Sequence, residues 1–165
     1  MSEFHQTGPI TTLHGFYELQ DRDQYLSWLE NKLERVSRQR QIGLLLPCLY
    51  DEILAREVLD NIVGQINDVR YLSTIVVALG GAKEERQFLE AKAYFDQLRQ
   101  GGRKVKVVWV DGPRIQSVFQ KLEAAKIPVG VPGKGQSVWI TLGYLFAAAD
   151  CSLIALHDTD IVTYD

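Results

Sequence analysis

Apolar residues alternate between two patterns along the chain. Four short runs, at 42–46, 73–79, 105–110 and 151–156, are almost continuously apolar, as expected for strands that helices cover on both faces. Between these runs the apolar residues recur at helical spacing, beginning with the stripe from Ile53 to Ile66. Alternating strands and helices predict an α/β fold with a doubly wound, mainly parallel sheet.

The same pattern divides the chain into two parts. A helix over about 21–40 precedes the first strand, so residues 1–40 form an N-terminal extension and 41–165 form the α/β unit. In open parallel sheets, ligands bind beyond the carboxyl ends of the strands. That rule singles out the loops at 47–52, 80–84, 111–114 and 157–164.

Composition narrows the classes of partner. The 165 residues are 46% apolar and carry a net charge of −3, so no basic field attracts nucleic acid. No apolar stretch approaches the ~20 residues of a membrane span, and the N-terminus lacks the order of a signal peptide. Cys48 and Cys151 lie beside or within apolar runs, which predicts buried thiols in a reducing compartment. We therefore expect a cytoplasmic protein without a membrane or nucleic-acid partner.

Two aspartates, Asp158 and Asp160, follow the last predicted strand with one residue between them. Asp21 and Asp23 have the same spacing, but they open a polar helix, where aspartates complement the helix dipole. Carboxylates held close together repel each other unless a cation lies between them. Mg²⁺ accepts one or two carboxylates and fills its other positions with water and substrate phosphate oxygens. The pair predicts a metal–phosphate site, and a solvated strand end is the alternative.

Lys134 lies between Gly133 and Gly135 where the last predicted helix begins. Glycines beside an ammonium group at a helix N-terminus favour an anion. The stretch is not a Walker A loop, because Pro128 occupies the position of the first glycine and Gly135 follows the lysine. No G-x-G-x-x-G follows the first strand, which disfavours a standard dinucleotide fold. The alternative for Lys134 is an ordinary exposed loop lysine.

The first strand runs into the sequence PCLYDE, from Pro47 to Glu52. We expect Pro47 to interrupt the strand and turn the chain, and Asp51 and Glu52 to begin a helix. Helix capping alone would explain both carboxylates. The functional interpretation is a pocket for a nucleotide base, with Glu52 or the backbone of Leu49 facing the base.

Taken in order, P-x-L-x-x-E, P-G-K-G and a strand ending in D-x-D resemble retaining nucleotide-sugar glycosyltransferases of the GT-A fold. The resemblance covers about residues 42–165 and is greatest to the glucosyl-3-phosphoglycerate synthase and mannosylglycerate synthase group. It implies metal-dependent transfer of a hexose from a nucleoside diphosphate sugar to a small acceptor such as glycerate or 3-phosphoglycerate. Residues 41–165 would then be the nucleotide-sugar-binding half of a GT-A domain.

The resemblance also implies roles for six residues. Pro47, Leu49 and Glu52 would hold the nucleobase and ribose, and Lys134 would contact the nucleotide or its diphosphate. Asp160 would coordinate Mg²⁺ or Mn²⁺, and Asp158, the other member of the metal pair, would contact the ribose or sugar. The resemblance assigns no catalytic residue to this chain, and it leaves the base, the sugar and the acceptor open.

Two features depart from the family pattern. Gly80 and Gly81 stand where the family has an acidic or hydroxyl side chain, and the sequence ends five residues after Asp160. Family enzymes continue there with an acceptor site and a late metal-binding histidine. We therefore expect a donor-binding half that binds without catalysing, whose sheet is incomplete at its C-terminal end. An unfinished sheet edge also suggests a homo-oligomer.

Two other functions fit parts of the sequence. A haloacid-dehalogenase-type phosphatase would use Asp158 as nucleophile and Asp160 as acid and base. A non-catalytic α/β binding or assembly domain, similar to a receiver, would use Asp51–Glu52, Asp111 and Lys134.

Overall fold

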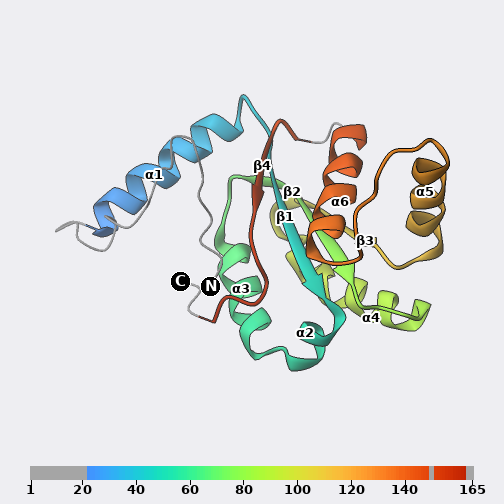
Figure 1. The fold of residues 1–165 in the computed structure, drawn as a ribbon. Coiled ribbons are helices and arrows are strands. Elements are labelled where there is room, and N and C mark those ends of the chain that lie inside the picture. Colours follow the sequence, from blue (N-terminus) through green and yellow to red (C-terminus); the bar gives the residue numbers. More distant parts are fainter. Residues whose placement is uncertain (1–21, 149–150, 163–165) are drawn as a thin grey trace, which may run out of the picture.

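Four parallel strands form the sheet at the centre of the computed structural model, which describes residues 22–148 and 151–162 (Figure 1). Their order is β3-β2-β1-β4, and each neighbouring pair is parallel. The predicted α/β class with a mainly parallel sheet is confirmed. The strands are β1 (Ile42–Leu49), β2 (Leu72–Gly80), β3 (Lys104–Trp109) and β4 (Leu153–Leu156).

Helices cover both faces of this sheet. Both sides of each strand are therefore buried, which explains why the strands are almost continuous apolar runs in the sequence. Leu44 and Leu46 of β1 pack on one face with α2, α3 and α4, whereas Leu45 packs on the other face with α5 and α6. The long helix α1 reaches away from the sheet (Figure 1). The helices are α1 (Arg22–Ser37), α2 (Tyr50–Ala55), α3 (Glu57–Asp68), α4 (Glu85–Phe95), α5 (Pro113–Ala124) and α6 (Lys134–Ala148), with short 3₁₀ turns η2 (Asp96–Leu98) and η3 (Gln100–Gly102). No helix in the described parts of the chain combines the length and the hydropathy needed to cross a membrane.

Helix positions agree with the sequence pattern except in one place. The helix expected over about 21–40 is α1, whereas the stripe from Ile53 to Ile66 belongs to two helices rather than one. The break is at Arg56, whose φ of 20° and ψ of −30° leave the helical region. Side-chain periodicity continued across this break, and so it did not reveal the change in backbone direction.

Pro47 does not interrupt β1, and that expectation was wrong. The strand continues to Leu49 and remains paired with β2 as far as Gly80. The Leu45 carbonyl faces β4, since it accepts a hydrogen bond from the His157 amide at 3.1 Å. Backbone groups two residues apart face the same side, so Pro47 also faces β4, but beyond the end of its pairing at Leu156. No strand requires an N–H at that position, and the proline is tolerated.

Arg103, between η3 and β3, closes the C-terminal end of α3. Its guanidinium donates to the carbonyls of Ile66 at 3.1 Å and Val69 at 2.5 Å, and the residue is 8% exposed. Burial lowers the pKa of Arg103, but a guanidinium remains charged in proteins. The side chain therefore satisfies helix-end carbonyls that water cannot easily reach.

Replacing Arg103 with methionine is expected to lower the free energy of unfolding by about 2–3 kcal/mol, because buried carbonyls lose a charged donor while the apolar stem is kept. Urea unfolding measures the change. Arg70→Met removes an exposed arginine just before β2 and serves as the matched control. Equal losses for the two variants would contradict this role of Arg103.

Candidate functional site

The carboxyl ends of all four strands open into one cleft of about 440 Å³. This volume is within the range of small-molecule binding sites. All of the residues predicted from the sequence line the cleft except Asp158, which contacts it through Lys134. The lining residues are Pro47, Cys48, Leu49, Glu52, Ala78, Gly80, Gly81, Val110, Asp111, Pro132, Gly133, Lys134, Gln136, Ser137, Thr159 and Asp160.

Thr159, between the two aspartates, ties the end of β4 to the end of β1. It is 2% exposed, and its hydroxyl lies 2.7 Å from the Pro47 carbonyl oxygen and 2.5 Å from Oε2 of Glu52. Asp160, the next residue, is exposed in the cleft. The buried threonine thus holds the D-x-D segment against the end of β1 and the start of α2. Sequence reasoning missed Thr159, although a hydroxyl between two aspartates at a strand end was a visible signal.

Lys134 is the first residue of α6, as its flanking glycines predicted. Its Nζ lies 2.7 Å from Oδ1 of Asp158, and both side chains are about half exposed, at 51% and 44%. Such a solvated ion pair contributes at most about 1 kcal/mol, so another anion can replace the carboxylate at low cost. Gly133, just before the helix, has a φ of 152°, a conformation that disfavours any other residue. The ammonium group is therefore available to a ligand at the positive end of a helix.

Gly81 and Asp111 meet at the opposite end of the cleft, beyond β2 and β3. The Gly81 amide donates to Oδ2 of Asp111 at 2.6 Å. A Cβ atom on the preceding Gly80 would lie 3.4 Å from Cδ2 of Leu49 and 3.8 Å from Oγ of Ser137, which are ordinary contact distances. From the sequence, Asp111 was expected in a strand-end loop and had a role only in the receiver-like alternative.

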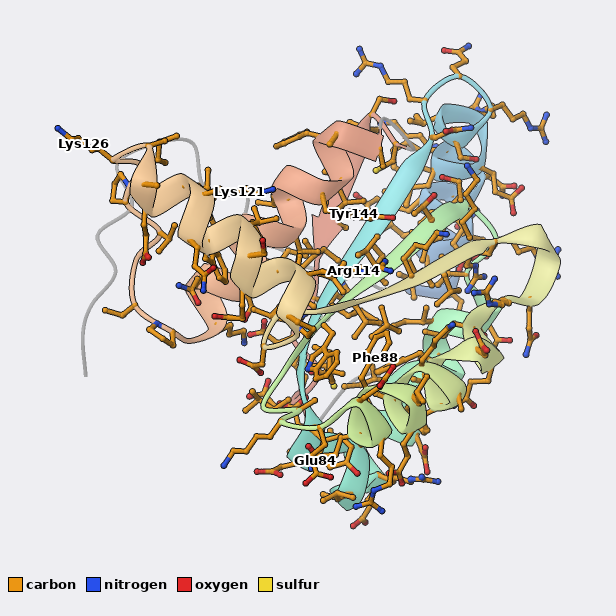
Figure 2. All side chains as sticks on the ribbon, turned by 90° about the vertical axis from the view of Figure 1, so that its right-hand side faces the viewer. Glu84, Phe88, Arg114, Lys121, Lys126 and Tyr144 are labelled. Carbon is orange, nitrogen blue, oxygen red and sulfur yellow. The ribbon has the colours of Figure 1, made fainter. Side chains whose placement is uncertain are left out.

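Aromatic side chains stabilise the loop that carries Gly81. Trp109 donates from Nε1 to the Ala82 carbonyl at 2.6 Å, and its ring stacks on Phe88 with centroids 5.3 Å apart. Figure 2 shows Phe88 between α4 and the sheet, and Glu84 at the start of α4. Glu84 and Gln87 form a reciprocal capping box there. These contacts fix the loop without occupying the cleft.

Two further ionisable groups lie near the strand ends. Burial raises the pKa of the Cys48 thiol, and the neighbouring carboxylate of Glu52 raises it further, so Cys48 stays protonated and is a poor nucleophile. Burial lowers the pKa of His157, although Asp158 opposes this effect, so the imidazole is neutral at neutral pH. Cys48 and Cys151 do not form a disulfide with each other, and the expected burial holds for Cys48 but only partly for Cys151.

The carboxylates at this site can hold a metal ion only when a bound ligand supplies further oxygen atoms. Within residues 22–148 and 151–162, no three histidine, cysteine, aspartate or glutamate side chains come together as a metal cluster. Asp160 is exposed in the cleft, but Asp158 is occupied by Lys134. Mg²⁺ and Mn²⁺ suit such a sparse oxygen site when phosphate oxygens and waters complete the coordination.

The phosphatase alternative finds little support in this geometry. Its nucleophile would be Asp158, which is not among the residues that line the cleft and whose carboxylate is paired with Lys134. A nucleophile has to reach the phosphorus atom in line with the leaving group. The exposed carboxylate is instead Asp160, the residue expected to bind the cation.

The chain is similar in sequence to glucosyl-3-phosphoglycerate synthases. It is 43% identical to that of Persephonella marina over 164 residues, which are 99% of this chain and 38% of the relative. It is 35% identical to that of Methanococcoides burtonii over 156 residues, which are 94% of this chain and 35% of the relative. The chain thus spans well under half the length of these curated relatives. No protein-family model matches it.

Among solved structures, the chain is similar to glucosyl-3-phosphoglycerate synthase from Mycobacterium tuberculosis in complex with Mn²⁺, uridine diphosphate and glucosyl-3-phosphoglycerate. The sequence identity is 24%, the TM-score is 0.46, and the match covers 81% of this chain and 38% of that chain. At this TM-score the likeness does not extend to the details of a site.

Proposed function

We propose that this chain, which is related over nearly its whole length to glucosyl-3-phosphoglycerate synthases as its motifs predicted, forms the donor-binding part of a divalent-metal-dependent glycosyltransferase. The donor would be a nucleoside diphosphate hexose and the acceptor a small organic acid such as glycerate or 3-phosphoglycerate. One observation carries the proposal: a single cleft collects Pro47, Leu49 and Glu52 together with Lys134 and Asp160. Residues 41–165 would form this unit, with 1–40 as an extension.

The charged groups support a diphosphate position near the end of β4. Lys134 offers an ammonium group at the N-terminus of α6, where backbone amides also favour an anion. Asp160 would hold Mg²⁺ or Mn²⁺ against the phosphate oxygens, and Asp158 would turn to the ribose or sugar once Lys134 moves to the ligand. A bound divalent cation would neutralise the charge that develops on the leaving diphosphate. Transfer would retain the anomeric configuration.

The junction between β1 and α2 supplies the apolar part of the donor site. Leu49 is 55% exposed and lines the cleft, so it offers an apolar surface to a base. Glu52 is half-buried and held by Thr159, which gives its carboxylate a fixed position for ribose hydroxyls. A base and a ribose are thus bound by one apolar contact and one polar contact from neighbouring residues.

Metal-dependent nucleotide binding tests this proposal. Calorimetric titration with UDP, GDP and ADP is expected to show binding of at least one nucleotide in Mn²⁺ or Mg²⁺, and binding at least about 10-fold weaker in EDTA, because Asp160 and the phosphates hold the cation jointly. Absence of binding by every nucleotide in the presence of metal would refute the donor site. Equal affinity with and without metal would refute the role of the cation.

The proposal also covers the cellular compartment and the oligomeric state of the protein. Cys48 and Cys151 are not joined by a disulfide, which fits a reducing cytoplasm. β4 lies at the edge of the described sheet; its last residue, Leu156, is 52% exposed, and Phe146 of the neighbouring helix α6 is 72% exposed. Open strand edges with apolar neighbours favour pairing, and a homo-oligomer would form there.

A further inference from the structure

The order of the strands determines which residues lie at each end of the cleft. Thr159 and Asp160 follow β4 at one edge of the sheet, and Val110 and Asp111 follow β3 at the other edge. The cleft crosses the ends of β1 and β2 between them. If the diphosphate lies at Asp160, as the proposed function requires, the nucleobase at the far end of the donor lies toward Asp111.

The β2–β3 end of the cleft is nearly bare of polar side chains. Among the described lining residues that follow or belong to these two strands, Asp111 alone has one, and the others are Ala78, Gly80, Gly81 and Val110. Ala78 and Val110 are buried and apolar. A flat base can enter this space because the two glycines place no side chain in it. Ser137 of α6 also lies near Gly80, but its hydroxyl donates to the Gly133 carbonyl at 3.1 Å, so Asp111 supplies the charged acceptor at this end.

The Gly81 amide determines which carboxylate oxygen of Asp111 is available to a ligand. It donates to Oδ2 at 2.6 Å, and the residue is exposed, so Oδ1 stays available to the cleft. An ionised carboxylate only accepts hydrogen bonds. It pairs well with the ring N–H of uracil (N3) or guanine (N1), and it faces a lone pair on the corresponding ring nitrogen of cytosine (N3) or adenine (N1).

We propose that Asp111 reads the nucleobase and selects donors whose base carries a ring N–H, uracil or guanine. Asp111 reaches the cleft from the strand end next to Gly80 and Gly81, which have no side chains. The diphosphate would be repelled by this carboxylate, which keeps the donor in one orientation along the cleft. This inference rests on the proposed function, because it requires a nucleotide with its phosphates at Asp160.

Asp111→Asn tests the inference by exchanging an acceptor for a donor. The amide oxygen keeps the hydrogen bond from Gly81, which turns the NH₂ group toward the base. We expect the wild type to bind UDP at least about 10-fold more tightly than CDP, or GDP than ADP, since a mismatched polar edge leaves buried groups unpaired. In Asp111→Asn that preference should fall at least about 10-fold and approach or pass equality. Asp68→Asn removes one exposed carboxylate at the other end of β2 and is the matched control, expected to keep the wild-type preference.

A second measurement leaves the protein unchanged. If the wild type prefers UDP, methylation of N3 of the base should weaken binding to the level of CDP; if it prefers GDP, methylation of N1 should weaken it to the level of ADP. Metal-dependent binding with an unchanged base preference in Asp111→Asn, or with no effect of methylation, would overturn the inference alone. If the variant loses affinity equally for nucleotides of every base, the inference is also overturned, because Asp111 would then contact the ribose or stabilise the loop. Absence of any nucleotide binding by the wild type would overturn the proposed function as well.

Discussion

Replacing Asp160 with asparagine is expected to weaken nucleotide binding in Mn²⁺ roughly 100-fold, to about the affinity of the wild type in EDTA. The side chain is exposed in the cleft, so the substitution keeps its shape and removes its charge. A neutral amide oxygen is a much poorer ligand for a hard divalent cation than a carboxylate oxygen. Calorimetric titration of the best-binding nucleoside diphosphate with and without metal measures the effect, and Asp68→Asn again controls for the loss of one negative charge.

Asp158→Asn separates the roles of the two aspartates. Asp158 is paired with Lys134 at 2.7 Å, so its substitution releases an ammonium group beside the expected diphosphate. In EDTA, the Asp158→Asn variant should therefore bind nucleotide as tightly as the wild type or more tightly. The Asp160→Asn variant should show almost the wild-type affinity in EDTA. If both variants lose the same metal-dependent affinity, the two carboxylates hold the cation together. A loss confined to Asp158→Asn would contradict the assignment of Asp160.

The sheet and the position of the cleft could be predicted from the sequence because both depend on local patterns. Apolar runs located the strands, and the alternation of strands and helices implied parallel pairing, which β1 shows with both β2 and β4. Parallel strands bring their carboxyl ends to one edge, so the loops at 47–52 and 157–164 were predicted to meet. The structure places Glu52 and Thr159 in contact at that edge.

Contacts between particular side chains could not be predicted in the same way. The hydrogen bond from Thr159 to the Pro47 carbonyl joins residues 112 positions apart, and its geometry depends on which side of β1 faces β4. Asp111 had the signal of its position after a strand, but its partner Gly81 has no side chain that marks a role. The backbone break at Arg56 left no trace in the apolar spacing. Each of these features depends on backbone direction, which a pattern of residue types does not record.

Thr159→Val is expected to lower the free energy of unfolding by about 2–3 kcal/mol, although valine has nearly the same shape as threonine. Thr159 is 2% exposed, and its hydroxyl lies between the Pro47 carbonyl oxygen and the carboxylate of Glu52. The hydroxyl has one proton and donates to one of these two oxygens at a time, so a methyl group there leaves that oxygen without its donor. Urea unfolding measures the loss, and Thr159→Ser, which keeps the hydroxyl, should recover most of the stability.

The same substitution should also weaken metal-dependent nucleotide binding about 10-fold, because Thr159 holds Asp160 in position over the turn that carries Glu52. A double-mutant cycle with Glu52→Gln isolates the contact: if Thr159 acts through Glu52, the two losses of stability are less than additive. Additive losses would assign the effect of Thr159 to the Pro47 carbonyl alone. If Thr159→Val stays within about 0.5 kcal/mol of the wild type and binds nucleotide normally, the buried hydroxyl does not join the two parts of the site. In that case the D-x-D segment is positioned by the pairing of β4 with β1 alone.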